Sequence, residues 1–436
     1  MSILLLIAWN LIFFLIFFLI IPITLFHKKI RRAFWGRFLM VPRLKQWRKS
    51  HEEDIISIHC ASYGEFEHIR QFIQQLKRRY PDKSVVILFF SSSGYDHFKD
   101  DPGLDGVFYT PLEFVWSTVR FFRVLRPTMH IIAKHDVWPT EVLVLHKMGI
   151  PMYLINASLS ENSSRHRYFA SFHRFLYSHL DHIFAITEED AERFKKYLHI
   201  PERSIDAVGD TKNDQVLNRK NKALQNPLIP RNLLRDDQSI MVLGSVWGED
   251  WKSLRDVLVE KLNSYDAFKL VVCPHELNKD FINGVAADLT EFSPMIFSDP
   301  NELRQLREIP KVTIINIMGV LADLYSIADF AFVGGSFKGK VHNVLEPAVY
   351  GIPVLTGPFI TNSTEALNLK SVGGLFVVEK PEEIDDIITK CIRDETFRKS
   401  HGTYAETFVM QRLNASQQIV DTLVSQMKAV GNRDNE

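Results

Sequence analysis

Two stretches of the sequence combine residue types that could bind and activate a substrate. The first, FVGGSFKGKVHNVLEP, ends an apolar run with Gly334 and Gly335. Paired glycines let the backbone come close to a ligand. Ser336 can donate a hydrogen bond to an anion, and Lys338 and Lys340 add positive charge. Together these residues predict a pocket for an anionic ligand.

The helix start after this loop, with His342, Asn343 and Glu346, allows two interpretations. Asn343 could cap the helix, with Glu346 three residues later completing a capping-box pair. Alternatively, the Glu346 carboxylate could accept hydrogen bonds from the two hydroxyls of a ribose, as an acidic residue does in dinucleotide-binding folds. The sequence has no Walker motif and no GxGxxG, which disfavours ATP-hydrolysing and nicotinamide-dependent enzymes.

The second stretch, ASYGEFEH, follows an apolar run near the start of the polar part of the chain. Gly64 permits a sharp turn, and Glu65 falls in the first turn of the helix expected next. A carboxylate there interacts favourably with the helix dipole, so a simple cap is one interpretation. A general base pointing into a cleft is the other. These residues alone favour the cap.

Three weaker signals stand at the ends of other expected strands. Gly244 and Ser245 in LGSVWGED could offer backbone N–H groups to a phosphate. His275 in CPHE is a lone histidine, and such residues are more often structural than ligands. His135 and Asp136 in AKHDVWPTE have the composition of a metal site, but neighbours on a strand point apart. We therefore predict no metal site.

The elements that would position these residues are apolar strands alternating with amphipathic helices. Strands apolar on both faces are typical of a parallel sheet covered by helices, so the pattern predicts doubly wound α/β domains. The expected strands cover residues 54–60, 83–94, 129–136 and 150–160, a strand running into a helix over 181–198, and then 239–247, 268–276, 311–317, 329–336, 352–358 and 373–379. Two such domains would bind ligands in the cleft at their strand carboxyl ends.

The N-terminus is predicted to be a membrane anchor. From Ile3 to Phe26 the chain is almost wholly apolar, and this run would span about 36 Å as a helix, enough for a bilayer core of about 30 Å. A cleaved signal peptide is the alternative, but no cleavage-site pattern follows. The basic segment 27–50 lacks acidic residues, which places the rest of the chain in the cytoplasm and suits anionic lipid headgroups.

Composition limits the remaining possibilities. With 436 residues the chain is long enough for two domains, and its net charge of zero gives no indication of nucleic-acid binding. The three cysteines, Cys60, Cys273 and Cys391, are far apart, which fits a reducing compartment. We expect an anchor (1–26), a basic juxtamembrane segment (27–50), a Rossmann-like domain (51–217), a linker (218–238) and a second Rossmann-like domain (239–436).

Taken together, the motifs resemble the 3-deoxy-D-manno-octulosonic acid (Kdo) transferases of lipopolysaccharide synthesis. SYGE is similar to the family's S-x-G-E, VWPT to L-W-P-N, LINASLSENS to L-V-N-A-R-L-S-x-R-S, and VGDTKND to G-N-x-K-x-D. IMGVLADLYSIADFAFVGGS and HNVLEPAVYGIPVLTGP resemble the two long motifs of the second domain. The resemblance covers nearly the whole chain, and the motifs occur in the family's order.

The resemblance implies a fold and an activity. It implies two Rossmann-like domains of the GT-B glycosyltransferase type, the first for the acceptor and the second for the donor CMP-Kdo. The acceptor would be a lipid A precursor at the cytoplasmic face of the inner membrane, with no cofactor and no metal. Glu65 matches the family's catalytic glutamate. The donor pocket would be formed by Gly244, Ser245, His275, Gly334, Gly335, Ser336, Lys338, His342, Asn343 and Glu346.

Departures from the family pattern concern the donor site. The family's P-R-H reads CPHE here, so an arginine is missing, and Lys338, Lys340 or Arg165 could replace it. Val320 stands where the family has a glutamate, G-G-H-N reads KVHN, and NASLSENS lacks an arginine. A UDP-sugar transferase or epimerase of the same architecture, or an inactive membrane scaffold, are the alternatives. The basic RFFRVLR segment (120–126) could face lipid, or form part of an ordinary core helix.

Overall fold

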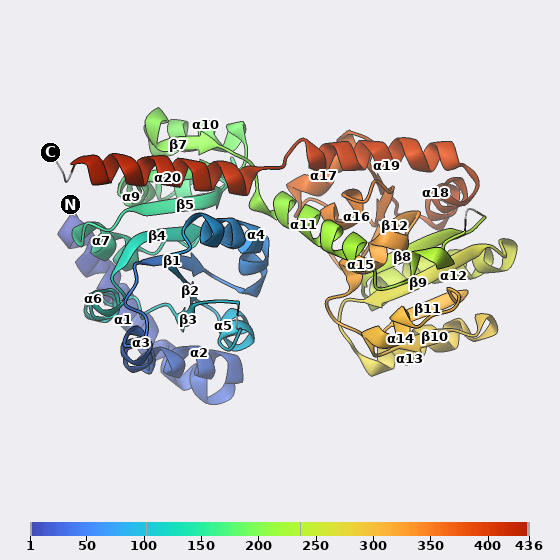
Figure 1. The fold of residues 1–436 in the computed structure, drawn as a ribbon, viewed down its shortest axis with the longest axis horizontal. Helices are drawn as coiled ribbons and strands as arrows, with labels where there is room; N and C mark the ends of the chain where they lie inside the picture. The colour runs from blue at the N-terminus through green and yellow to red at the C-terminus, as the bar shows by residue number, and fades with distance from the viewer. Residues whose placement is uncertain (1, 102, 236, 434–436) are drawn as a thin grey trace. The chain divides into compact units, whose positions relative to one another are not determined.

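The computed structural model describes residues 2–101, 103–235 and 237–433 (Figure 1). The chain forms two compact units. Unit 1 comprises Met1–Gln215 and Asn414–Glu436, and unit 2 comprises Val216–Leu413. Each unit contains one seven-stranded sheet, and the strand pairs that the structure describes are all parallel. This arrangement confirms the predicted fold class.

The sheet of unit 1 is built from strands that are buried on both faces. Its order is β3 (Gly106–Tyr109), β2 (Ser84–Phe89), β1 (Ile55–Cys60), β4 (Pro127–Ala133), β5 (Met152–Ala157), β6 (His182–Ala185) and β7 (Ile205–Ala207). Ile58 of β1 pairs with Ile87 on one side and with Ile131 on the other. After β1 the chain adds β2 and β3 on one side of β1, and then places β4 on the other side of β1. The crevice where open α/β sheets bind ligands therefore lies at the carboxyl ends of β1 and β4.

The helices of unit 1 cover this sheet. They are α1 (Ser2–Phe26), α2 (Lys28–Phe38), α3 (Met40–Arg48), α4 (Tyr63–Arg79), α5 (Ser92–Phe98), α6 (Val115–Leu125), α7 (Pro139–Lys147), α8 (Ser164–Arg167), α9 (Ala170–Tyr177), α10 (Glu188–Leu198) and α20 (Ala415–Arg433). In α4, Phe66, Ile69, Ile73 and Leu76 recur at helical spacing and are buried. This one-sided apolar stripe fixes α4, and with it the loop before it.

Unit 2 repeats the architecture. Its sheet order is β10 (Met295–Phe297), β11 (Val312–Ile315), β9 (Phe268–Pro274), β8 (Ser239–Val246), β12 (Phe330–Val333), β13 (Val354–Thr356) and β14 (Leu375–Val377). Its helices include α12 (Gly248–Ser264), α13 (Lys279–Asp288), α14 (Pro300–Arg304), α15 (Leu321–Leu324), α16 (Leu345–Ala348), α17 (Thr364–Ser371), α18 (Pro381–Arg393) and α19 (Glu395–Met410). From β8 the chain first adds strands on one side of the sheet, beginning with β9, and then continues on the other side of β8 with β12. The equivalent crevice therefore lies at the carboxyl ends of β8 and β12.

The core of unit 2 has a layer on each sheet face. Met241 and Leu243 of β8 belong to one apolar cluster, and Ile240 and Val242 belong to another. Because alternate strand residues point to opposite faces, both faces are packed. The strands that the sequence predicted are present, whereas β3, β7 and β10 were not predicted. These three are only three or four residues long and lie at or beside the sheet edges.

Two predicted segment boundaries differ from the structure. The expected linker 218–238 begins inside helix α11 (Thr211–Gln225), because Val216 and Ala223, seven residues apart, bury one helix face. The chain from residue 414 on belongs to unit 1 rather than to the second domain. There the Asp214 carboxylate accepts hydrogen bonds of 2.7 Å from the backbone N–H groups of Asn414 and Ser416, and α20 packs against α4 (Figure 1).

The basic segment 27–50 is also part of unit 1 and not a separate flank. It forms α2 and α3, and Met40 and Leu44 are fully buried in the unit 1 core. Trp47 donates a hydrogen bond of 2.8 Å to the backbone oxygen of Asp105. The alternative of a lipid-facing 120–126 segment is wrong for its two phenylalanines, since Phe121 and Phe122 of α6 are buried in the same core.

Among the described residues, one helix, Ile7–Phe26, is long and apolar enough to cross a membrane. It is compatible with the predicted anchor. The three cysteines are buried and free.

Candidate functional sites

Glu65 lies in the first turn of α4, directly after β1, at the crevice of unit 1. Its Oε2 accepts a hydrogen bond of 2.7 Å from the backbone N–H of Ala61, so the side chain does help to fix the helix start. The other carboxylate oxygen accepts no hydrogen bond from the described residues. Both interpretations of Glu65 are therefore compatible with one geometry, in which one oxygen positions the group and the other remains available.

The neighbours of Glu65 tune its protonation. Burial raises the pKa of the Glu65 carboxyl above its ordinary value, and the Asp136 carboxylate adds to this effect. The hydrogen bond from Ala61 and the positive charge of Lys134 oppose it. Lys134 and Asp136 come from the turn after β4, the second strand of the crevice. A carboxylate with a raised pKa is a better proton acceptor than an ordinary glutamate.

A buried charge cluster lies behind this carboxylate. His59 of β1 contacts Glu141 Oε2 through Nδ1 at 2.7 Å and Asp136 Oδ2 through Nε2 at 3.0 Å. Since both partners are carboxylates, both ring nitrogens carry hydrogen and the ring is an imidazolium. Burial lowers the pKa of His59, but the two carboxylates outweigh it and raise that pKa to about 10. Burial keeps His130 neutral by lowering its pKa to about 4, and this ring bonds to the Ser57 hydroxyl at 2.7 Å.

His59, His130 and Glu141 also place possible metal-ligand atoms within 4.8 Å of one another. However, His59 and Glu141 already form a direct hydrogen bond at 2.7 Å. The cluster is therefore better described as an ion-paired network that holds Asp136 beside Glu65. His135 and Asp136 lie in a turn rather than on a strand, and they contact different partners.

The crevice of unit 2 is organised by a residue that the sequence analysis did not single out. Asp250, in the first turn of α12, is fully buried. Its carboxylate accepts backbone N–H groups from Gly335 at 2.7 Å, Trp247 at 2.9 Å and Phe337 at 3.2 Å. Two amides of the glycine loop thus point inward to Asp250. These two amides are therefore not available to an anion, and the exposed cationic side chains of this loop are Lys338 and Lys340.

Three aromatic rings form the open side of this crevice. His275 stacks on His342 with ring centroids 4.1 Å apart and on Trp247 at 4.6 Å. Trp247 Nε1 donates to His342 Nε2 at 2.9 Å, and Lys338 Nζ lies 3.3 Å from the centroid of the Trp247 ring. Burial lowers the pKa of both histidines, that of His342 to about 4, so the stack is neutral. Such a surface can stack on a nucleobase, and the lysine can meet a phosphate.

The remaining glycines and serines of the predicted donor site have packing roles. A Cβ on Gly244 would lie 2.0 Å from the Tyr325 hydroxyl, and one on Gly334 would lie 2.4 Å from the Ser245 backbone oxygen. Gly335 has φ +93° and Ser245 has φ +55°. These positions shape the turn at the strand ends, where a close backbone approach is required.

Ser336 does not present its hydroxyl to the surface. The side chain is fully buried, and its Oγ lies 2.9 Å from Thr356 Oγ1. Because the Thr356 hydroxyl donates to the Val333 backbone oxygen, Ser336 is the donor in this pair. Its expected hydrogen bond to an anion is therefore already committed inside unit 2.

Asn343 and Glu346 do not form the capping-box pair. Asn343 Oδ1 accepts a hydrogen bond of 3.3 Å from the Leu345 N–H, whereas the residue before α16 is Val344. Glu346 Oε1 accepts a 2.6 Å hydrogen bond from Arg219 of α11. Arg219 was not predicted to be near the site, because 127 residues separate the partners. A ligand hydroxyl would share the Glu346 carboxylate with this guanidinium.

Of the candidates for the missing arginine, Lys338 and Lys340 lie in the unit 2 loop. Arg165 lies on α8 of unit 1, with Nη1 3.4 Å from the Ser158 backbone oxygen. Two residues that organise the crevices, Asp250 and His59, were missed because their signals in the sequence are weak. Asp250 lies three residues after Trp247 in a stretch that was singled out for its glycine, and His59 is a polar residue in an otherwise apolar strand.

The fold has clear counterparts among solved structures. UDP-GlcNAc 2-epimerase from Neisseria meningitidis bound to UDP-GlcNAc aligns with a TM-score of 0.61 at 16% identity, covering 85% of this chain and all of that chain. Acinetobacter baumannii MurG aligns with a TM-score of 0.54 at 13% identity, covering 86% and 99%. With two parallel α/β units, the chain has the two-domain GT-B architecture of glycosyltransferases.

Sequence relatives narrow this class. Residues 33–215 match the family model described as 3-deoxy-D-manno-octulosonic-acid transferase (kdotransferase). A 3-deoxy-D-manno-octulosonic acid transferase of Haemophilus influenzae is 29% identical over 379 residues, 84% of this chain and 86% of that protein. The Chlamydia muridarum protein of the same name is 27% identical over 418 residues, 93% of each chain. These relatives confirm the resemblance of the motifs to the Kdo transferase family, and the chain is a glycosyltransferase.

Proposed function

We propose that the chain transfers Kdo from CMP-Kdo to a lipid A precursor at the cytoplasmic face of the inner membrane. The main support for this proposal is the geometry of Glu65. Its carboxyl group lies at the unit 1 crevice, its pKa is raised, and one of its two oxygens is available to a substrate. Glu65 accepts the proton of an acceptor hydroxyl as the oxygen attacks the anomeric carbon, with inversion. The Ala61 N–H positions this base, and the charges of His59 and Asp136 act on its pKa.

The donor belongs to unit 2 in this proposal. The stacked rings of Trp247, His275 and His342 receive the cytosine ring, and Lys338 and Lys340 balance the negative charge of the leaving CMP. Glu346 binds the ribose while paired with Arg219. The names of the relatives support Kdo as the transferred sugar. The apolar helix α1 supports attachment to a membrane.

A mass-spectrometric transfer assay tests the proposal. Detergent-solubilised protein is mixed with freshly generated CMP-Kdo and a tetra-acylated lipid A precursor. We expect product carrying one or more added Kdo residues, and a rate about 10²- to 10⁴-fold lower for Glu65→Gln, the range typical of a lost general base. Excess chelator is expected to leave the rate unchanged, because the proposed steps use side chains of the protein only.

The matched control is Glu67→Gln, on the same helix, where the carboxylate pairs with Arg70 at 2.7 Å. It is expected to keep nearly full activity. Equal losses in both variants would contradict the assignment of Glu65. Preference for uridine over cytidine nucleotides in a binding screen would instead favour a UDP-sugar enzyme of the same fold.

A further inference from the structure

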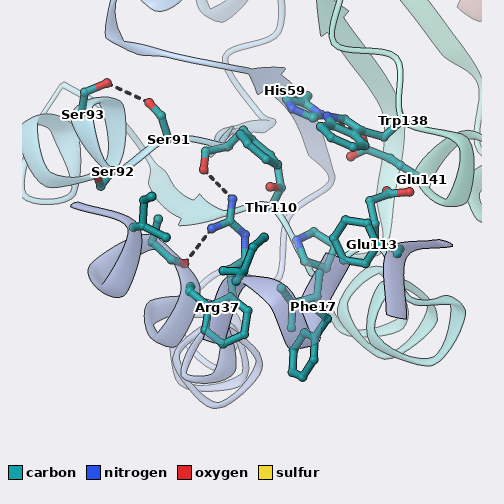
Figure 2. Close-up of a pocket in the computed structure, with 18 of the residues that line it drawn as sticks. Phe17, Arg37, His59, Ser91, Ser92, Ser93, Thr110, Glu113, Trp138 and Glu141 are labelled. Carbon is teal, nitrogen blue, oxygen red and sulfur yellow. Dashed lines mark hydrogen bonds and ion pairs between the residues drawn. The ribbon is translucent and has the colours of Figure 1, made fainter. Parts of the chain in front are cut away.

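Unit 1 contains a mostly apolar hollow that shares His59 and Glu141 with the charge cluster behind Glu65. It is a cavity of about 510 Å³, within the range of ligand pockets in proteins. Its walls are mostly apolar: Phe13, Phe17 and Ile20 come from α1, Phe34 from α2, and Leu112 from the loop after β3. Figure 2 shows the titratable groups along it, which are Arg37, His59, Glu113 and Glu141, together with hydroxyl groups such as that of Thr110.

Helix α1 forms one wall because it packs along unit 1 by a single face. Trp9 Nε1 donates to Glu113 Oε2 at 3.0 Å, and Asn10 Oδ1 accepts from the Val115 N–H at 3.1 Å. Two turns further on, the Phe17 ring lies 5.5 Å from that of Phe114 and 5.0 Å from that of Phe34. These contacts fix the helix beside the cavity over several turns.

The opposite face of α1 is apolar and uncovered. Leu15 and Leu19, one turn apart, are 66% and 69% exposed, and Leu11 and Phe18 extend the same surface. A row of this size is unfavourable in water and is expected to lie in lipid. The helix that forms the wall of the cavity is therefore also the part of unit 1 that we expect to contact the acyl region of a membrane.

The cavity lies next to the candidate base. The backbone N–H of Ser91, a lining residue, donates to the Ala61 oxygen at 2.9 Å. The N–H of the same Ala61 donates to Glu65 at 2.7 Å. His59, another lining residue, also lies close enough to Glu65 to lower the pKa of that carboxyl. A molecule that presents a sugar hydroxyl to Glu65 therefore has the cavity beside it for a chain.

The polar end of the cavity carries a fixed positive charge. Arg37 Nη1 donates to the Ala33 backbone oxygen at 2.6 Å and Nη2 donates to that of Phe90 (Figure 2). The guanidinium carbon lies 4.8 Å from the Phe90 ring centroid and 5.2 Å from that of Tyr109. Burial lowers the Arg37 pKa to about 10, and the group stays protonated at neutral pH. Such a cation complements phosphate or ester oxygens at the head of a lipid.

We propose that this cavity binds one acyl chain of the lipid acceptor, with α1 as its wall and Arg37 at its polar end. The inference rests on the proposed lipid acceptor and adds to it a site for the chain. It assigns α1 a role in substrate binding beyond attachment to the membrane.

Photo-crosslinking tests the site without any turnover. The probe is a tetra-acylated lipid A precursor with a diazirine at the end of one acyl chain, added to full-length protein in detergent without CMP-Kdo. Ile20→Trp fills the cavity from α1, and the adjacent Leu19→Trp places the same ring on the exposed face. We expect labelling of the peptides with Phe90 and Leu112 in the wild type and in Leu19→Trp, and loss of at least about tenfold in Ile20→Trp.

Each other outcome has a definite meaning. Labelling confined to the exposed face of α1, or unchanged in Ile20→Trp, would overturn the inference. Equal competition by phosphatidylglycerol and by unlabelled precursor would also overturn it, because the occupant would then be a membrane phospholipid. CMP binding in all three proteins confirms that unit 2 is folded. If the transfer assay succeeds while labelling avoids the cavity, this inference fails and the proposed function stands.

Discussion

The two units place their candidate sites at the same point of the same fold but build them from different chemistry. In unit 1, Glu65 stands in front of a buried cluster of charges, His59 between Asp136 and Glu141. In unit 2, the carboxylate of the buried Asp250 accepts hydrogen bonds from backbone amides. The more accessible surface there consists of the rings of Trp247, His275 and His342 and of the side chains of two lysines. A proton-accepting site needs neighbours that set a pKa, whereas a nucleotide site needs a rigid loop and a flat surface. The fold gives the location and the neighbours give the role.

Breaking the charge cluster should have the largest effect. His59→Gln leaves Asp136 and Glu141 without their cationic partner, and losing one member of a buried ion pair typically costs about 3–5 kcal/mol. Hydrogen exchange of the β1 and β4 peptides measures this as a local free energy of opening. His146→Gln, on the exposed surface of α7, is the control and should change little. Equal changes of the opening free energy in His59→Gln and His146→Gln would show that the cluster does not contribute more to stability than a surface histidine.

The same cluster should make unit 1 sensitive to alkaline pH. The ordinary pKa of histidine is about 6.5, and that of His59 in the folded protein is raised to about 10. Its contribution to stability is therefore complete below pH 6.5 and is lost as the pH rises through about 10. Protection of β1 should fall over this window in the wild type and stay flatter in His59→Gln. A parallel fall in both proteins would show that another group is responsible.

In unit 2 the corresponding test is Asp250→Asn. The amide places N–H groups against at least one backbone donor of the loop, and each buried group left without a partner costs about 1–3 kcal/mol. We expect faster exchange of residues 334–337 and weaker CMP binding by calorimetry, with Glu65 chemistry affected only through donor occupancy. Glu249→Gln, next to it and exposed, should bind CMP normally. Normal binding by Asp250→Asn would mean that the loop does not need this anchor.

The smallest expected effect is a shift in a pH profile. Glu65 acts as the carboxylate, so the rate rises as the pH passes upward through its pKa. Lys134 lowers that pKa, and Lys134→Met should move the acidic limb of the rate at saturating substrate to higher pH without changing the plateau. Lys147→Met on α7 should leave the limb in place. If the acidic limb of the pH–rate profile does not move in Lys134→Met, that limb reports the pKa of a group other than Glu65.

Much of the fold could be predicted from local sequence. Strands such as 54–60 and 239–247 are apolar enough to show that both faces are covered, and α4 shows its buried stripe at helical spacing. The short edge strands β3, β7 and β10 were not found this way, because their three or four residues stand without a longer apolar run around them, such as the one that marks β13 in 352–358. Glu65, His275 and the glycine loop could be singled out because each follows an apolar strand directly.

The partners of these residues could not be predicted. Glu141 is 82 residues from His59, and Arg219 is 127 residues from Glu346. Such pairs depend on which strands become neighbours, and a single sequence does not give that order. The sequence predicted correctly that Ser336 follows a strand, but it could not predict the direction of the Ser336 side chain. That side chain points inward to Thr356 because of tertiary packing, so the predicted contact with an anion does not form.

The last helix of the chain affects the order in which the protein can fold during synthesis. The hydrogen bonds that the Asp214 carboxylate accepts from Asn414 and Ser416 cannot form during synthesis until these residues are added, 200 and 202 residues later. Domains generally fold as units while the chain emerges. Unit 2 has all its residues by Leu413, whereas unit 1 lacks α20 until the final residues are added. The unit whose synthesis starts first is therefore the one that is completed last.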